Sequence, residues 1–128
     1  MTSLARMLAR TPPIACAHGS WPRCTTSNRL LRVHTPDDTF VFTARLLSNN
    51  QPVGRSQGAC TATAGNASEC RGTLFLKDGK IFILGGTVFN SKTTLGIVGG
   101  TGPYIGSRGT LTTTKRKSGD LLEVKLLP

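Results

Sequence analysis

The stretch LFLKDGKIFIL, residues 74–84, decides the fold class. Apolar runs lie on both sides of Lys77-Asp78-Gly79-Lys80, and the dipeptide Asp78-Gly79 fits the two central positions of a type I′ turn. We therefore predict a β-hairpin in which Phe75 pairs with Phe82. One face of this hairpin then carries an aliphatic set: Leu74, Leu76, Ile81 and Ile83. The other face carries an aromatic set: Phe75, Phe82 and Leu84. Both faces are apolar, so each of them needs cover from water.

Similar short strand patterns, separated by turn signals, run along the rest of the chain. Apolar and polar residues alternate at period two, as in half-buried strands, and Gly, Asn, Asp and Pro lie between the runs. The predicted strands are 40–46, 53–63, 69–76, 80–89, 93–98, 104–115 and 120–127, with 29–34 as a candidate eighth. In the last hairpin, Leu122 and Val124 point one way while Glu123 and Lys125 point the other. We predict an all-β fold, an antiparallel closed barrel of about eight strands, within residues 29–128.

Residues 1–28 are assigned to a disordered or targeting extension outside this fold. They contain Pro12, Pro13 and Pro22 and no sustained apolar period. Arg6 and Arg10 interrupt each run that could serve as a secretory signal, whereas an Arg-rich, acid-poor composition is that of an organelle transit peptide. A plain disordered extension and a wrongly assigned start codon are the alternatives.

The charge balance permits a nucleic-acid partner but does not favour one. The 128 residues carry 16 Lys and Arg against 6 Asp and Glu, a net charge of +10. The only dense basic run is 115–117, which we interpret as a solvated turn between strands. The few aromatic residues do not alternate with basic ones, as stacking on bases would require. No apolar run approaches the ~18 residues of a membrane span. We expect neither a nucleic-acid partner nor a membrane span.

Cys60 and Cys70 lie at equal distances from Gly65. A hairpin centred on Gly65 places the two cysteines directly opposite each other, and opposed residues are about 4.5–5.5 Å apart at Cα, within the range of a disulfide. We predict a disulfide, and two buried thiols are the alternative. The predicted location is secreted or organellar rather than cytoplasmic.

Residue patterns that could carry catalysis are sparse. The glycines of 96–106 do not have the spacing of a dinucleotide turn, and no Lys follows them as in a P-loop. Cys16, His18 and Cys24 match no usual zinc spacing. No Ser-His-acid arrangement and no carboxylate pair for acid–base chemistry can be recognised. We predict no cofactor and no metal site.

The stretch GGTGPYIGSRG, residues 99–109, resembles a motif of the dirigent and allene oxide cyclase barrel-like superfamily. Residues 58–61 and 69–73 resemble segments of small bacterial members of this superfamily. The resemblance covers about residues 38–127. It implies an eight-stranded barrel with an apolar cavity, often assembled as dimers or trimers, in a family that guides or catalyses cyclisation and coupling of small molecules. The matching motif positions are Gly99, Gly100, Gly102, Tyr104, Arg108 and Gly109.

The resulting hypothesis is a small barrel that binds an apolar small molecule in its lumen. A cyclase or dirigent-type role, acting by conformational positioning, is the leading function. A non-catalytic binding or interaction protein on the same barrel is the main alternative, and a basic oligonucleotide-binding barrel is a weaker one, so the question of catalysis stays open. A homodimer or homotrimer is expected, with the aliphatic set at the interface. The candidate ligand-binding residues are Phe40, Phe42, Phe75, Phe82, Tyr104 and Arg108.

Overall fold

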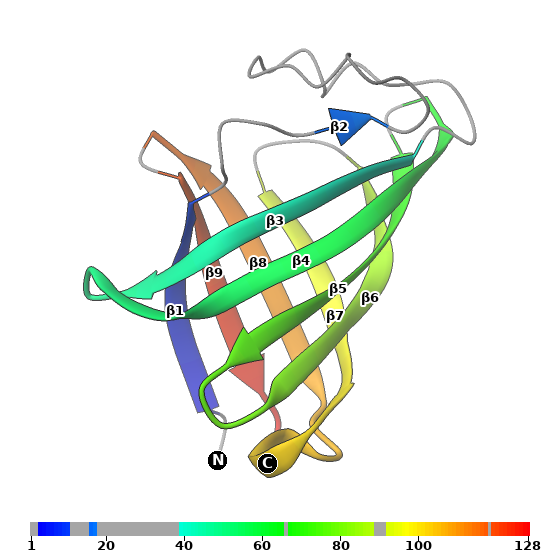
Figure 1. The fold of residues 1–128 in the computed structure, drawn as a ribbon. Helices are drawn as coiled ribbons and strands as arrows, with labels where there is room; N and C mark the ends of the chain where they lie inside the picture. Colours follow the sequence, from blue (N-terminus) through cyan, green and yellow to red (C-terminus); the bar gives the residue numbers. More distant parts are fainter. Residues whose placement is uncertain (1–2, 11–15, 18–38, 66, 89–91, 118) are drawn as a thin grey trace.

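The computed structural model describes residues 3–10, 16–17, 39–65, 67–88, 92–117 and 119–128. Antiparallel strands make up most of them (Figure 1). One short 3-10 turn, η2 (Gly102–Tyr104), follows the seventh strand. In chain order the strands are β1 (Ser3–Arg10), β2 (Cys16–Ala17), β3 (Thr39–Ser48), β4 (Gln51–Ala64), β5 (Ala67–Leu76), β6 (Lys80–Val88), β7 (Lys92–Gly100), β8 (Gly109–Arg116) and β9 (Gly119–Leu126).

The strands form one sheet that closes on itself. From β3 to β9 each strand pairs with the next one along the chain, and β1 then pairs with both β9 and β3. This ring of β1 and β3–β9 confirms the predicted eight-stranded closed barrel. The short β2 pairs with the first part of β3, at Phe40 and Val41. In Figure 1 strands β3–β6 lie in front of β7, β8, β9 and β1.

Alternation along the strands separates an inner from an outer face. The inner-facing side chains form one apolar core, in which Leu46, Leu74 and Ile81 are almost completely buried. Outward positions carry polar, charged and some apolar side chains, such as Arg45, Glu69 and Leu84. The last hairpin follows the predicted pattern, with Leu122 and Val124 buried inside.

The predicted domain boundary at the N-terminus is wrong. Ser3–Arg10 were assigned to an extension, but they form β1 and pair with β9 from Ser3 to Ala9. The physical reason is the period of a strand. Met7 and Ala9 point inward and are buried, whereas Arg6 points outward and forms an ion pair with Glu123 at 3.3 Å. The remainder of the predicted extension, apart from Cys16–Ala17, and the candidate strand at 29–34 lie outside the described residues.

The hairpin at residues 74–84 forms, but its register differs from the prediction. Leu74, not Leu76, pairs with Ile81, and Phe75 pairs with Lys80. The connection is longer than two residues, and Leu76 N donates a hydrogen bond to the Gly79 carbonyl oxygen at 2.8 Å. A shift of two residues preserves the parity of each strand, so the aliphatic and aromatic sets still lie on opposite faces.

The two sets are nevertheless on the opposite sides to those we predicted. Leu74, Ile81 and Ile83 are buried inside the barrel, whereas Phe82 and Leu84 lie outside with 37% and 51% of their surface exposed. Local alternation cannot distinguish two apolar faces. The choice follows from barrel closure, because the aliphatic set packs against inner residues of other strands such as Leu46 and Ile97.

The Gly65 hairpin has the predicted pairing. Cys60 lies directly opposite Cys70, and a disulfide joins them with a Cα–Cα distance of 4.1 Å. Both cysteines are buried on the inner face. One further expectation needs correction, because the segment 104–115 is not one strand: Tyr104 ends η2, and β8 begins only at Gly109.

Candidate functional site

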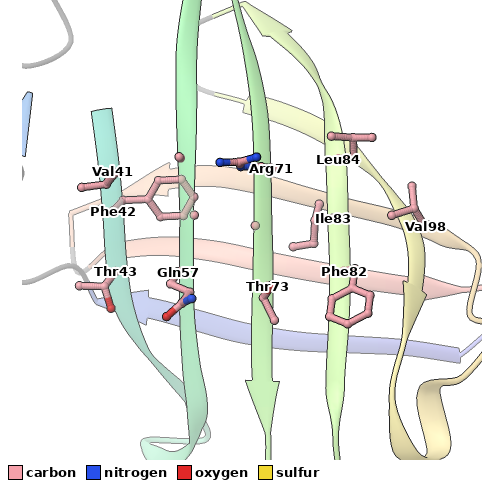
Figure 2. Close-up of a pocket in the computed structure, with 13 residues that line it drawn as sticks. Val41, Phe42, Thr43, Gln57, Arg71, Thr73, Phe82, Ile83, Leu84 and Val98 are labelled. Atoms are coloured by element: carbon pink, nitrogen blue, oxygen red, sulfur yellow. The ribbon is translucent and has the colours of Figure 1, made fainter. Parts of the chain in front are cut away.

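A shallow groove of about 810 Å³ runs across the outer face of β3–β7 (Figure 2). Its apolar walls come from Val41, Phe82, Leu84 and Val98, and Gln57 and Arg71 add polar groups. Val41, Leu84 and Val98 are each about half exposed. A small-molecule site usually buries most of its ligand, which a groove on an outer sheet face cannot do. Exposed apolar patches are typical of interaction surfaces.

Two glycines provide the floor of this groove and also accommodate an aromatic ring on the inner side. Phe42 pairs with Gly58, which in turn pairs with Gly72. A Cβ on Gly58 would come within 2.5 Å of Phe42 Cζ, so the ring lies against the inner side of β4. Phe42 therefore covers positions at which the barrel wall has no side chain of its own.

The inner wall of the barrel has two chemically different ends. At one end it is filled by large aliphatic side chains, among them Leu46, Leu74, Ile81, Leu111 and Val124. Toward the other end most inner side chains are small or carry hydroxyl groups, and the aromatic rings of Phe40 and Phe42 on β3 also point inward there. The small and hydroxyl-bearing inner residues at this end are Gly58, Ala62, Ser68, Gly72, Gly85, Thr87, Thr93 and Thr113, together with the disulfide.

Four of the hydroxyl-bearing residues follow one another around the wall, and we call them the hydroxyl row: Ser68, Thr87, Thr93 and Thr113. Ser68 on β5 pairs directly with Thr87 on β6, and Thr93 on β7 pairs directly with Thr113 on β8. Thr87 Oγ1 donates a hydrogen bond to Thr93 Oγ1 at 3.2 Å. Ser68 Oγ is buried, and within the described part of the chain it has no hydrogen-bond partner.

Asp120 adds a carboxylate to the same wall. It shares the inward parity of Leu122 and Val124, is half buried, and lies directly opposite Lys115 on β8 and Ala9 on β1. Burial raises the pKa of this carboxyl above its ordinary value of 3.8, and the nearby Lys115 ammonium lowers it in part. A carboxyl with a raised pKa can exchange a proton with a bound ligand closer to neutral pH than an exposed one can.

The predicted site residues do not converge on one place. Phe40 and Phe42 occupy inward positions of β3 and are half buried. Phe75 is on the outer face, where the Arg55 guanidinium lies 4.0 Å from its ring centroid. Phe82 lines the outer groove. The predicted orientation of Phe75 and Phe82 toward the lumen is therefore wrong.

The two motif side chains are also apart from the inner polar end. Tyr104 is half buried against the apolar core and borders a second depression of about 650 Å³, whose other lining residues include Met7 and Asn49. Arg108 is exposed and donates a hydrogen bond from Nη1 to the Val98 carbonyl oxygen at 3.3 Å.

The motif glycines hold backbone segments together. A Cβ on Gly100 would overlap the Lys80 carbonyl oxygen, and one on Gly102 would overlap the Asp78 carbonyl oxygen. Gly109 has the same role against the Lys125 carbonyl oxygen, with φ at +155°. At Gly99 a Cβ would make only an ordinary 3.7 Å contact with Phe82. The motif thus packs η2 and β8 against their neighbours.

Asp120 and the hydroxyl row were not among the predicted site residues. A usable signal existed for Asp120, because it has the same parity as the inward Leu122 and Val124. For Ser68 the signal was its parity with Cys70. Among the described residues, no three His, Cys, Asp or Glu side chains lie close enough to hold a metal ion. The described segments contain no helix long and apolar enough to span a membrane.

Comparison with known proteins identifies the fold. No protein-family model matches the chain, and no curated protein matches its sequence. Among solved structures, pyocyanin demethylase superimposes with a TM-score of 0.80 at 24% identity over 98% of this chain and 100% of that chain. The chain has the fold of the dirigent barrels. Two pterocarpan synthase dirigent proteins, GePTS1 and PsPTS1, align over 98% of this chain with TM-scores of 0.68 and 0.65 at 15% and 17% identity.

These two dirigent structures are covered to 86% and 93% of their own length. The resemblance predicted from residues 99–109 is thereby confirmed at the level of the fold.

Proposed function

We propose that this barrel binds an apolar small molecule in its interior, at the end where the inner wall is made of small and hydroxyl-bearing residues. The observation that carries the proposal is the contrast between the two ends. Apart from the rings of Phe40 and Phe42 on β3, the inner residues at this end are Ala, Ser, Thr, Gly and the disulfide, and Ala, Ser and Gly occupy much less volume than the Leu and Ile at the other end. An eight-stranded barrel is just wide enough either to be filled by side chains or to hold one small ligand.

The structural relatives agree with this proposal. Pyocyanin demethylase and the two pterocarpan synthases are named for reactions on small molecules. At 24% identity or less this similarity shows only a shared fold. That the present chain binds a small molecule is our inference from the residues of its own inner wall.

A matched pair of neighbouring residues tests the location. Ala62 is buried on the inner wall opposite Ser68, whereas Thr63 is exposed on the outside. We expect the apolar dye Nile red to bind the wild type with about one site per chain. Ala62→Phe should remove this binding by filling the inner end, and Thr63→Phe should retain it, with circular dichroism unchanged in both. Equal binding by the two variants would contradict an interior site.

A catalytic role is the second candidate, and Asp120 is the observation that favours it. A cyclase or dirigent-type barrel holds its ligand in one reactive conformation, and a half-buried carboxyl can move a proton to or from that ligand. Asp120→Asn keeps the size of the side chain and removes the acid. If the barrel is catalytic, this variant should retain ligand binding and lose turnover. If it only binds, no turnover will be found in the wild type either.

We further propose that the chain self-associates through the outer groove. This assigns the interface to Val41, Phe82, Leu84 and Val98 in place of the aliphatic set, which lies in the core. The wild type should sediment as a dimer or trimer at micromolar concentration. Leu84→Lys combined with Val98→Lys should give a folded monomer, and Thr94→Lys, on the outer face away from the groove, should not. A monomeric wild type would refute this interface.

The disulfide favours a compartment outside the cytoplasm, because cytosolic thiols are kept reduced. We propose a secreted or organellar location. Fractionation with detection of the Cys60–Cys70 peptide under non-reducing conditions tests it, and finding the chain in the cytoplasm with both thiols free would refute it.

A further inference from the structure

We propose that the hydroxyl row is a hydrogen-bonding subsite that recognises an uncharged oxygen group, a carbonyl or a hydroxyl, on the interior ligand, with Ser68 as a residue that determines specificity. This inference rests on the proposed interior binding and adds the chemical class of group that the wall selects.

The first support is that the Ser68 hydroxyl is buried without a hydrogen-bond partner among the described residues. Its side chain is 1% exposed and its Oγ has no partner within the described residues. Buried hydroxyl groups nearly always have a hydrogen-bond partner, because leaving one without a partner costs free energy. Ser68 faces inward, with the same parity as Cys70, so a missing partner would have to come from the interior.

The second support is the continuity of the row across four strands. Thr93 Oγ1 accepts the hydrogen bond from Thr87, which leaves the Thr93 hydroxyl proton as a donor. Thr113 lies directly beside Thr93 on the next strand. A hydroxyl group both donates and accepts, so the row can satisfy either a carbonyl or a hydroxyl on the ligand. Thr is common in strands, but that preference does not explain the buried Ser68 between Ala67 and Glu69.

The third support is the distribution of charge on this wall. Of the described inward residues on β5–β9, only Lys115 and Asp120 carry charge, and they lie opposite each other near the end of the last hairpin. No cation stands on the hydroxyl row to balance a phosphate or carboxylate, and hydroxyl groups alone compensate a buried charge poorly. The row therefore favours an uncharged polar group.

The position of Ser68 relative to Asp120 also constrains the ligand. In the ring of eight strands, β5 and β9 are four positions apart and thus lie on opposite walls. The ligand edge that meets Ser68 faces away from the carboxylate. A neutral oxygen acceptor at that edge avoids repulsion by Asp120.

Two probes of nearly equal size, naphthalene and 2-naphthol, test the inference by fluorescence titration of the full chain. In the wild type, 2-naphthol should bind about fivefold more tightly than naphthalene, the gain expected from one net hydrogen bond. Ser68→Ala and, independently, Thr93→Val should remove most of that preference while leaving naphthalene affinity unchanged. Thr94→Val, on the outer face next to Thr93, should have no effect on either probe.

The outcomes separate the two proposals. If neither probe binds, interior binding fails and this inference fails with it. If both bind equally to the wild type, or if Ser68→Ala weakens both probes equally, the subsite is refuted while interior binding stands. A structural role for the Ser68 hydroxyl would lower the melting temperature of the ligand-free Ser68→Ala variant, whereas a ligand-binding role leaves that temperature unchanged or raised.

Discussion

Replacing Gly100 by alanine is expected to destabilise the barrel strongly, whereas the same replacement at Gly99 is not. A Cβ at Gly100 would lie 2.6 Å from Tyr104 Cβ and 2.7 Å from the Tyr104 carbonyl oxygen, and it would also overlap the Lys80 carbonyl oxygen. None of these atoms belongs to a flexible side-chain end that could move aside. They are held further by hydrogen bonds from Thr101 N to Lys80 O at 2.9 Å and from Lys80 N to Thr101 Oγ1 at 3.0 Å.

The size of the effect follows from these contacts. Inserting a methyl group into a packed region costs about 1–3 kcal/mol, and sometimes more. Because the added methyl group would meet three backbone or Cβ atoms, we expect Gly100→Ala to lower the free energy of unfolding by about 3 kcal/mol. For a chain of 128 residues, 1 kcal/mol lowers the melting temperature by about 3–5 °C, so we expect a decrease of about 10 °C. At Gly99 the added Cβ meets only Phe82 Cδ2 at 3.7 Å, so the change should be within about 0.5 kcal/mol of zero.

Thermal unfolding followed by circular dichroism, and urea unfolding at 25 °C, measure both variants against the wild type. The two substitutions make the same chemical change at adjacent positions, so Gly99→Ala controls for the loss of backbone freedom. Equal melting temperatures for the two variants would refute the close packing of η2 against the start of β6.

Three further predictions concern the disulfide, the N-terminal strand and Asp120. Replacing Cys60 and Cys70 together by alanine should lower the free energy of unfolding by about 3 kcal/mol, the chain-entropy value for so short a loop, and reduction of the wild type should match it in urea unfolding. Met7→Ala should lower the free energy of unfolding by at least about 2 kcal/mol because Met7 is buried. Arg6→Ala removes only an exposed ion pair and should lower it by less than about 1 kcal/mol. Equal effects of the two variants in urea unfolding would argue against β1 in the barrel. The raised pKa of Asp120 means that its charge disfavours the fold: its favourable contribution is present below pH 3.8 and is lost as the pH rises through the folded-state pKa. Asp120→Asn should therefore melt at a higher temperature than the wild type at pH 7, and the difference should shrink toward pH 3.

Local signals were sufficient for most of the strand pattern. The Gly65 hairpin and the Cys60–Cys70 pairing followed from the position of one turn, because the register of a short hairpin depends only on its own residues. The inward positions of Leu122 and Val124 and the outward positions of Glu123 and Lys125 followed from one apolar and one polar face of β9. In such segments alternation alone decides which side is buried.

The remaining differences arise from contacts between distant parts of the chain. In the sequence of β1, Arg6 and Arg10 interrupt the apolar residues, so the segment alone does not indicate a buried strand. Its burial depends on pairing with β9, more than 100 residues away in the sequence. Likewise, residues 74–84 have two apolar faces, and only closure of the barrel decides that Leu74 and Ile81 lie inside. The alternation of residues along one strand does not indicate which of two apolar faces contacts the other strands.

That ambiguity bears directly on the candidate site. With Phe82 and Leu84 placed inside, the lumen would be lined by aromatic rings and the outer face by polar groups and aliphatic side chains. With the observed orientation, the inner wall at the polar end carries Ser68, threonines and Asp120 beside Phe40 and Phe42, and the apolar outer groove needs a cover of its own. A sheet with two apolar faces requires two partners. The barrel core covers one of them, and the self-association that we propose through the groove would cover the other. It would leave the interior open, because the groove and the hydroxyl row lie on opposite sides of the same wall.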